Sequence, residues 1–197
     1  VIATGGYSAN NALCRKFNSE ISALMPSTAN PGGRYLDGAW GDALEFTKPF
    51  HAATVDLDKI QKICFLGGRL VDYTGADIYL NKNGLRFVNE GASHGDVLVE
   101  LLKQPQRAMW VITDSQSKKG LSLENKLADG AVKKFDSLRQ VAAFIGCPAE
   151  TLEETVTRYN DFVLKGVDKD FGKKVMLQTI SYPPFYVGQE RVGVHYC

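Results

Sequence analysis

The strongest local signal in the chain is Ile78-Tyr79-Leu80-Asn81-Lys82-Asn83-Gly84-Leu85-Arg86-Phe87-Val88-Asn89. Two runs rich in aromatic and branched residues flank Lys82-Asn83-Gly84, and Asn-Gly between such runs is the strongest short-range sign of a β-hairpin. We therefore expect strands at residues 78–81 and 85–89, joined by a tight turn.

A helix and two further strands are expected after this hairpin. Ser93 can cap a helix whose third residue is Asp96, a variant of the capping box with Asp in place of Glu. Pro105 ends that helix. Residues 108–113 are expected to form a buried strand, and residues 132–135 a further strand.

Two more helices follow. Residues 138–145 come directly after the capping residue Ser137, and Gly146 stands at the position where a left-handed residue ends a helix. A second helix is expected from Pro148 to Gly166, because its apolar residues recur at spacings of four, three and four. Helices and strands do not alternate as regular βαβ units, which favours an α+β fold over a doubly wound sheet.

The N-terminal third has weaker signals. Its expected elements, in chain order, are a short strand (2–4), a helix (10–25), a glycine-rich loop (26–41), a short helix (41–50) and a half-exposed strand (53–60). The chain begins within an apparent strand and stops at residues 192–197 on strand-forming residues without a turn signal. We therefore expect it to be a piece of a larger protein.

Composition excludes several classes of protein. The 197 residues suffice for one compact domain, or for one domain and a small appendage. Lys and Arg number 23 against 22 Asp and Glu, so nucleic acid and anionic membranes are poor default partners. Hydrophobic residues at 44% and charged residues at 23% are typical of a folded protein. No apolar run approaches the roughly 18 residues of a membrane span.

The cysteines and histidines do not predict a metal site. The four cysteines contain no Cys-x-x-Cys pair, and the three histidines lie far from helical ligand spacing. Isolated cysteines are most simply buried or free thiols in a reducing compartment, which favours a cytoplasmic location. These residues are Cys14, Cys64, Cys147 and Cys197, and His51, His94 and His195.

Six segments, taken in order, resemble the fumarate reductase/flavocytochrome c branch of the FAD-dependent oxidoreductases (FAD-binding family 2). The most specific is Asn81-Lys82-Asn83-Gly84-Leu85-Arg86-Phe87-Val88-Asn89-Glu90, which closely matches the family's Asn-x-x-Gly-x-Arg-Phe-x-Asn-Glu hairpin. The others are Ala3-Thr4-Gly5-Gly6-Tyr7-Ser8, Gly41-Asp42, residues 55–61, residues 152–172, and residues 184–186 with 194–196. The resemblance covers essentially the whole chain.

The resemblance implies a capping (catalytic) domain of the succinate dehydrogenase/fumarate reductase flavoprotein type, with short flanking strands of the FAD-binding domain. Residues 1–50 would be the hinge-side segment of the FAD-binding domain with its connecting loop. Residues 51–182 would be the capping, substrate-binding domain, and residues 183–197 a return strand. FAD is implied in the full-length protein, completed by the remaining FAD-binding segments of the parent chain and not held tightly by this piece alone.

The resemblance also implies site residues. The family transfers hydride between flavin N5 and a carbon–carbon bond while a side chain supplies the proton. Its catalytic Arg lies eight residues after the position of Arg86, where this chain has His94. Histidine can also donate a proton, although a first-turn role in the expected helix is an equal alternative. His195 matches the family's substrate-binding His. The residues implied to face FAD are Thr4, Gly5, Gly6, Gly41 and Asp42.

Departures from the family pattern argue against fumarate as the substrate. Ile63 stands where the family has another carboxylate-binding His, and the family's Thr-Glu and Arg before the hairpin are missing. Arg69 and Tyr73 are candidates for lining the substrate pocket. We interpret Arg86 and Glu90 as a structural ion pair or a cap at the hairpin. The alternatives are a flavin-dependent dehydrogenase of the ketosteroid type, which relies on tyrosines, and a non-catalytic binding domain that keeps the fold.

Overall fold

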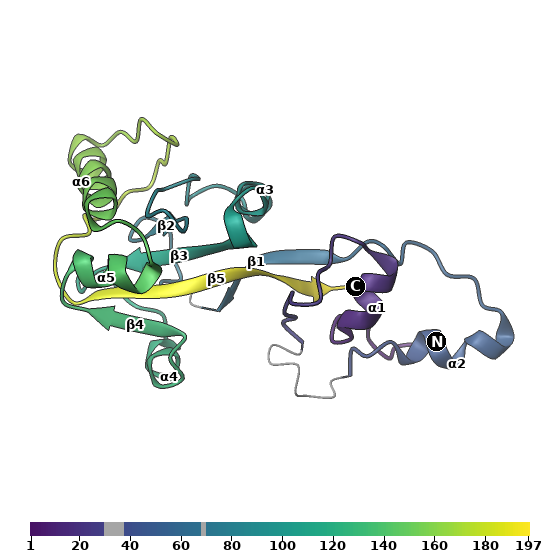
Figure 1. Ribbon diagram of the computed structural model, residues 1–197. Coiled ribbons are helices and arrows are strands. Elements are labelled where there is room, and N and C mark those ends of the chain that lie inside the picture. Colours follow the sequence, from purple (N-terminus) through teal and green to yellow (C-terminus); the bar gives the residue numbers. More distant parts are fainter. Residues whose placement is uncertain (30–37, 68–69) are drawn as a thin grey trace. The chain divides into compact units, whose positions relative to one another are not determined.

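The computed structural model describes residues 1–29, 38–67 and 70–197. By its contacts the chain divides into two compact units. The first, which we call the loop unit, comprises Val1–Ile63 and Val192–Cys197. The second, which we call the sheet unit, comprises Cys64–Arg191. Each unit is described by itself, with the helices and strands labelled as in Figure 1.

A five-stranded sheet organises the sheet unit. Its strand order is β1-β5-β3-β2, and β4 also pairs with β5. The β2–β3, β3–β5 and β4–β5 pairs are antiparallel, and all six residues of β3 are buried. The strands are β1 (Gln61–Gly67), β2 (Ile78–Leu80), β3 (Ala108–Thr113), β4 (Val132–Phe135) and β5 (Phe185–Tyr196), so β1 and β5 each have residues in both units.

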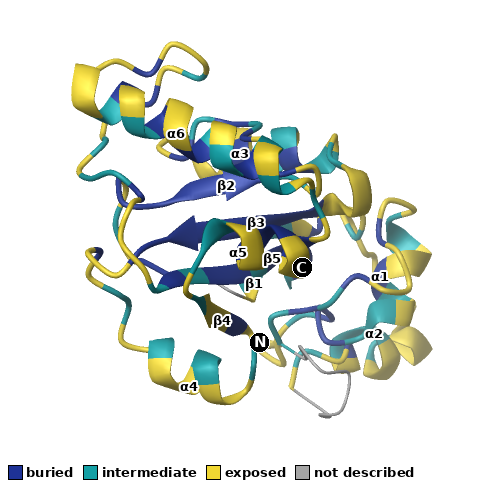
Figure 2. Ribbon diagram, turned by 60° about the vertical axis from the view of Figure 1, so that its left-hand side comes forward, coloured by how far each residue is buried: buried dark blue, intermediate teal, exposed yellow. Residues whose placement is uncertain are grey.

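Helices α5 (Leu138–Ile145) and α6 (Ala149–Lys165) bury their apolar stripes with residues of this sheet. Leu152, Val156 and Tyr159 of α6 are buried at the expected helical spacing, so that one face of the helix joins the core while the other stays in solvent (Figure 2). Burying an aliphatic side chain contributes roughly 1.5–3 kcal/mol, which makes this continuous cluster the main source of stability in the unit.

Two further helices complete the sheet unit: α3 (His94–Leu102) and α4 (Leu123–Ala128). The expected cap of α3 is confirmed, because the Ser93 hydroxyl accepts a hydrogen bond from Asp96 N at 3.2 Å. Ser137 caps α5 in the same way through Gln140 N, at 3.3 Å. The strands expected at residues 108–113 and 132–135 are also confirmed.

The hairpin is confirmed at its turn but not along its second arm. Asn81 N donates to Leu85 O at 2.9 Å, and Gly84 takes the left-handed conformation at φ +78°. Beyond one bridge between Leu80 and Arg86, residues 85–89 form no strand. The chain leaves the sheet here because the Arg86 side chain turns inward to a buried ion network.

The buried network joins two acids and two bases. The Arg86 guanidinium donates to both oxygens of Glu90 at 2.8 Å and to both oxygens of Asp168 at 2.9 and 3.3 Å. Lys173 Nζ lies 3.4 Å from Glu90 Oε2 and donates to Asp77 O at 2.6 Å. Bidentate Arg–carboxylate geometry is strong, and here it confirms the structural interpretation of Arg86 and Glu90.

The loop unit contains short helices and little regular sheet. Its helices are α1 (Asn11–Phe17), α2 (Asp42–Phe46) and the 3₁₀ turn η1 (Lys48–Phe50). Backbone bonds link distant segments: Thr28 N donates to Val194 O at 2.9 Å, and Val194 N donates to Pro26 O at 2.8 Å. The single helix expected at 41–50 is found as two short pieces, α2 and η1.

Three expectations for the N-terminal third are wrong. Residues 2–4 and 53–60 form no strand. Period-two alternation is not sufficient without a neighbouring strand, and Val55 is 82% exposed while Asp56 takes a left-handed φ of +54°. The helix expected at 10–25 ends at Phe17, because Asn18 is extended and its side chain accepts Glu20 N at 2.9 Å, which offers the backbone an alternative to the helix.

Taken together, the helices and the antiparallel sheet confirm the α+β class. Over residues 1–29, 38–67 and 70–197, none of the helices has the length and apolar character needed to cross a lipid bilayer.

Candidate functional site

The glycine turn of the loop unit brings three of the expected FAD-facing residues together. Gly5 takes φ +76°, and Gly6 O accepts a hydrogen bond from Gly41 N at 3.1 Å. A Cβ added to Gly6 would lie 2.0 Å from Cys197 O, so no other residue fits there. Thr4 and Gly5 are exposed, which leaves one side of this turn open to a ligand.

Gly41 is needed at its position for two reasons. It takes φ +100° as the residue before α2, and an added Cβ would lie 2.6 Å from Leu13 Cδ2 and 3.2 Å from Tyr7 Cβ. Asp42, the next residue, is the first residue of α2 and is exposed. The missing Cβ atoms of Gly6 and Gly41 thus let the chain pack closely on itself at this turn, while Thr4, Gly5 and Asp42 are exposed beside them.

His195 is held near the end of β5 by a residue that the sequence did not single out. Its Nδ1 lies 2.9 Å from the Thr28 hydroxyl, and its ring centroid lies 3.7 Å from that of Tyr196. When the hydroxyl donates to Nδ1, the ring proton sits on Nε2 and is available to an acceptor. The geometry therefore permits His195 to donate a hydrogen bond to a carboxylate.

His94 lies in the sheet unit, at the first position of α3, and is exposed. Its ring meets the Phe65 ring edge-on, with centroids 4.9 Å apart at 66°. Its carbonyl oxygen accepts a weak hydrogen bond from the Cys64 thiol at 3.7 Å. These two contacts position the main chain and the ring of His94. The imidazole is nevertheless exposed, so it can exchange a proton with solvent.

Tyr73 is half-buried, and its phenol oxygen accepts a hydrogen bond from Lys118 N at 3.0 Å. This contact ties two loops of the sheet unit together, and the phenol proton is still available to an acceptor. Arg69, the other candidate for the substrate pocket, lies outside the described residues.

The candidate residues thus fall into two sets. Thr4, Gly5, Gly6, Gly41, Asp42 and His195 belong to the loop unit, and His94 and Tyr73 belong to the sheet unit. Their roles remain predictions. Among the described residues, no group of three or more His, Cys, Asp or Glu side chains is arranged to hold a metal ion.

Arg86 controls the ionisation of Asp168 in the buried network of the sheet unit. Burial would raise the pKa of Asp168, but the hydrogen bonds and charge of Arg86 outweigh it and hold the pKa below its ordinary value. The sequence indicated Arg86 and Glu90 as a pair, but it did not link them to Asp168, within the resembling segment 152–172, or to Lys173, both about eighty residues further along the chain.

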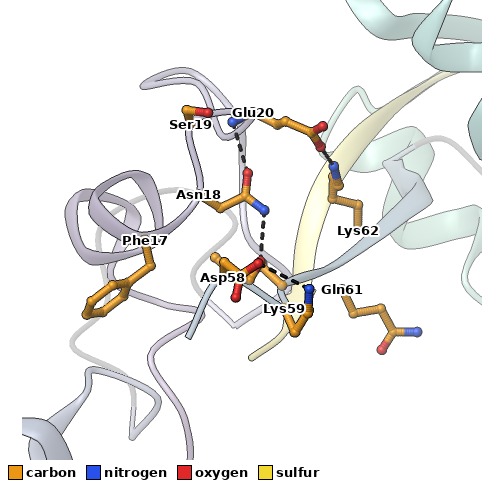
Figure 3. A pocket seen from close by; sticks show the side chains of 9 residues that line it. Phe17, Asn18, Ser19, Glu20, Asp58, Lys59, Gln61 and Lys62 are labelled. Carbon is orange, nitrogen blue, oxygen red and sulfur yellow. Dashed lines mark hydrogen bonds and ion pairs between the residues drawn. The ribbon is translucent and has the colours of Figure 1, made fainter. Parts of the chain in front are cut away.

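A surface hollow of about 710 Å³ in the loop unit contains none of the candidate residues (Figure 3). Its lining side chains pair with neighbouring groups: Asn18 Nδ2 donates to Asp58 O at 2.9 Å, and Lys62 forms an ion pair with Glu20. It is lined by Phe17, Asn18, Ser19, Glu20 and residues 58–62. These satisfied groups give no sign of a ligand, so we do not assign the hollow to the site.

Comparison with known proteins identifies the family. The family described as FAD binding domain matches residues 1–197. A fumarate reductase (cytochrome) of Shewanella frigidimarina is 29% identical over 203 residues, which are 100% of this chain and 34% of that protein. An NADH:acrylate oxidoreductase of Vibrio harveyi is 27% identical over 213 residues, which are 100% of this chain and 20% of that protein.

A solved structure supports the same relationship. The open conformation of a flavocytochrome c3 fumarate reductase superposes with a TM-score of 0.77 at 28% identity, covering 99% of this chain and 35% of that one. The chain thus spans about a third or less of the length of these relatives. It belongs to the FAD binding domain family, it resembles the fumarate reductase flavoproteins within that family, and FAD is the cofactor of the full-length protein.

Proposed function

We propose that the full-length protein is a flavin-dependent reductase that acts on the carbon–carbon double bond of an unsaturated acid other than fumarate. The observation that carries this proposal is the exposed His94 imidazole at the start of α3, eight residues after Arg86 in a closely matching motif. The family membership supplies the redox chemistry, and the chain's own residues supply binding and the proton.

The loop unit fits FAD. Gly5, Gly6 and Gly41 lie together, and the exposed residues of this turn are Thr4, Gly5 and Asp42, so we propose that FAD approaches from that exposed side. We assign residues 1–50 and 183–197 to the FAD-binding side and residues 51–182 to the capping domain. When bound, FAD supplies the hydride. Thr4 and Asp42, both exposed beside these glycines, supply polar groups to it.

Two histidines have separate roles in the proposed reaction. His195, with Nδ1 fixed by Thr28, donates its Nε2 proton in a hydrogen bond to the substrate carboxylate and draws electron density from the double bond. His94 gives a proton to the alkene carbon that does not receive hydride, and then regains one from solvent. Tyr73 and Arg69 are proposed to line the pocket.

The donor set favours a substrate with one carboxylate. Ile63 cannot bind a carboxylate at the position where the fumarate reductases have a histidine, and His94 provides a weaker electrostatic clamp than arginine. A second buried carboxylate would be left without a partner, which costs several kcal/mol.

The test compares acids on the full-length, FAD-loaded enzyme. Reoxidation of the reduced flavin is followed anaerobically with fumarate, with unsaturated monocarboxylates and with bulkier unsaturated acids. We expect His94→Gln to lower turnover of an accepted monocarboxylate by about 10²–10⁴-fold without loss of FAD. His51→Gln, at an exposed histidine of the loop unit, is the matched control.

Unchanged turnover in His94→Gln would exclude His94 as the acid. Preferred turnover of fumarate would contradict the proposed substrate class. Ligand binding without any turnover would favour the non-catalytic alternative, and turnover of ketosteroids but not of acids would favour the dehydrogenase alternative.

A further inference from the structure

Two cysteines of the loop unit meet the backbone of the same residue. Cys197 Sγ accepts a hydrogen bond from Tyr7 N at 3.3 Å, and Cys14 Sγ donates to Tyr7 O at 3.4 Å. Tyr7 itself is buried, and its hydroxyl donates to Leu57 O. One buried residue therefore contacts both sulfur atoms through its backbone, although 183 positions separate the two cysteines in the chain.

The surroundings make the two thiols unequal. Cys14 is fully buried, whereas Cys197 is half-buried. When the single Cys14 proton is donated to Cys197 in place of Tyr7 O, that hydrogen bond, assisted by Tyr7 N–H and the Ser8 hydroxyl, outweighs burial and lowers the pKa of Cys197 to about 7. Hydrogen bonding to Cys197, followed by burial, raises the pKa of Cys14. The backbone N–H that donates to Cys197 and the carbonyl that accepts from Cys14 favour a thiolate at Cys197 and a protonated thiol at Cys14.

We propose that Cys14 and Cys197 form a peroxide-sensitive pair, with Cys197 as the reacting thiolate and Cys14 as the resolving thiol. The Cys197 thiolate attacks a peroxide oxygen, the O–O bond breaks, and the second oxygen leaves as water after taking up a proton. Cys14 sulfur then attacks Cys197 sulfur, the S–O bond breaks, and the Cys14 proton leaves with the hydroxide as a second water. Two thiols are oxidised by two electrons, and hydrogen peroxide is reduced to two waters.

The resulting disulfide would lie directly against the glycine turn. An added Cβ on Gly6 would lie 3.6 Å from Cys197 Sγ, and Cys14 lies within α1. The bond would tie α1 to the end of the chain segment that carries His195. An influence of this disulfide on FAD binding at the glycine turn rests on the proposed function. Formation of the disulfide itself does not.

The other two cysteines serve as internal controls. Cys64 is buried in the sheet unit, where its thiol donates to His94 O. Cys147 is half-buried, like Cys197, but burial raises the pKa of its thiol. Cys147 therefore matches Cys197 in exposure but not in its hydrogen-bond donors.

The experiment treats the full-length, FAD-loaded protein with hydrogen peroxide, blocks the remaining thiols with iodoacetamide and maps non-reduced tryptic peptides by mass spectrometry. We expect a crosslink between the peptide that ends at Arg15 and the peptide that begins at Val192. Before oxidation, iodoacetamide should label Cys197 at least about ten times faster than Cys147 at neutral pH.

Matched variants separate the outcomes. Cys14→Ser should abolish the crosslink and leave Cys197 as a sulfenic acid that dimedone traps. Cys147→Ser should leave the crosslink between Cys14 and Cys197 as it is in the wild type. The proposal would be overturned if peroxide treatment did not change the iodoacetamide labelling of Cys14 and Cys197. A crosslink of Cys197 to Cys64 or Cys147 would also overturn it. These readouts do not involve turnover. Failure of the proposed reductase function would be detected in a different measurement, the reoxidation of the reduced flavin by unsaturated acids.

Discussion

The sheet unit and the loop unit are stabilised in different ways. In the sheet unit, every residue of β3 is buried, and the stripes of α5 and α6 share a continuous apolar core with the sheet. The loop unit depends more on backbone hydrogen bonds between distant loops and on glycines that allow close approach. Stability is thus concentrated in side-chain packing in one unit, and the proposed cofactor surface is made of backbone in the other.

The two units should therefore respond to different kinds of substitution. Substitution of a buried side chain should lower stability most in the sheet unit. Replacement of a glycine by alanine, which adds one Cβ atom, should weaken ligand binding most in the loop unit.

The largest effect is expected from Arg86→Met, in the buried network of the sheet unit. The change leaves the Glu90 and Asp168 carboxylates buried without their main partner, and breaking a buried ion pair in this way costs about 3–5 kcal/mol. Urea unfolding followed by circular dichroism measures the loss. The control is Arg158→Met, which breaks an exposed bidentate pair with Asp170 and should be indistinguishable from the wild type. Equal losses would contradict the view that the network stabilises the unit.

A smaller, pH-dependent effect is expected from Asp168→Asn. Because Arg86 holds the folded-state pKa of Asp168 below its ordinary value of 3.8, the ionised carboxylate stabilises the fold above about pH 4. That stabilisation is lost as the pH falls through the folded-state pKa. The variant should therefore be less stable than the wild type at pH 7, and the gap should narrow steadily below about pH 4 in urea titrations at several pH values. A gap that widens in acid would show the opposite sign of linkage.

Gly6→Ala tests the loop unit. Its Cβ would lie 2.0 Å from Cys197 O, so the turn must move, and FAD should bind at least about tenfold more weakly in the full-length protein. Unfolding of the sheet unit should stay unchanged. Gly38→Ala is the matched control, since its Cβ would meet nothing within 4 Å. If both variants bind FAD equally well, the glycine turn does not contact the cofactor.

The smallest effect is expected from Gly95→Ala in α3. Its Cβ would meet only the Ser93 hydroxyl, at an ordinary contact distance of 3.7 Å. Replacing a glycine inside a helix with alanine should stabilise the sheet unit by about 0.5–1 kcal/mol, measured as a higher urea midpoint. A loss of stability would indicate that the first turn of α3 is under a constraint other than helix propensity.

Much of the sheet unit could be predicted from the sequence, because its signals are local. Ser93 and Ser137 cap the helices that follow them, and α6 begins after Pro148 and ends before Gly166, as its apolar spacing indicates. The strands expected at 2–4 and 53–60 failed because a strand depends on its neighbour, which periodicity does not report.

The candidate site was predictable only where a motif carried it. The glycine positions were expected, and the structure brings Gly5, Gly6 and Gly41 together. Thr28 beside His195 was missed, because 167 positions separate the two residues and no local pattern links them. The unequal environments of Cys14 and Cys197 were missed for the same reason: Tyr7 N donates to Cys197 Sγ, whereas Tyr7 O accepts from Cys14 Sγ, and only the fold brings these groups together.

The four charged groups of the buried network have an evolutionary consequence. Arg86 and Lys173 balance Glu90 and Asp168, and no neutral replacement of one of them alone preserves that balance in a medium of low polarity. In related sequences, loss of a basic residue from this network should therefore be accompanied by loss of an acidic residue in the same lineage. Covariation at these sites in an alignment would record a history of paired events, with single losses rare among surviving lineages.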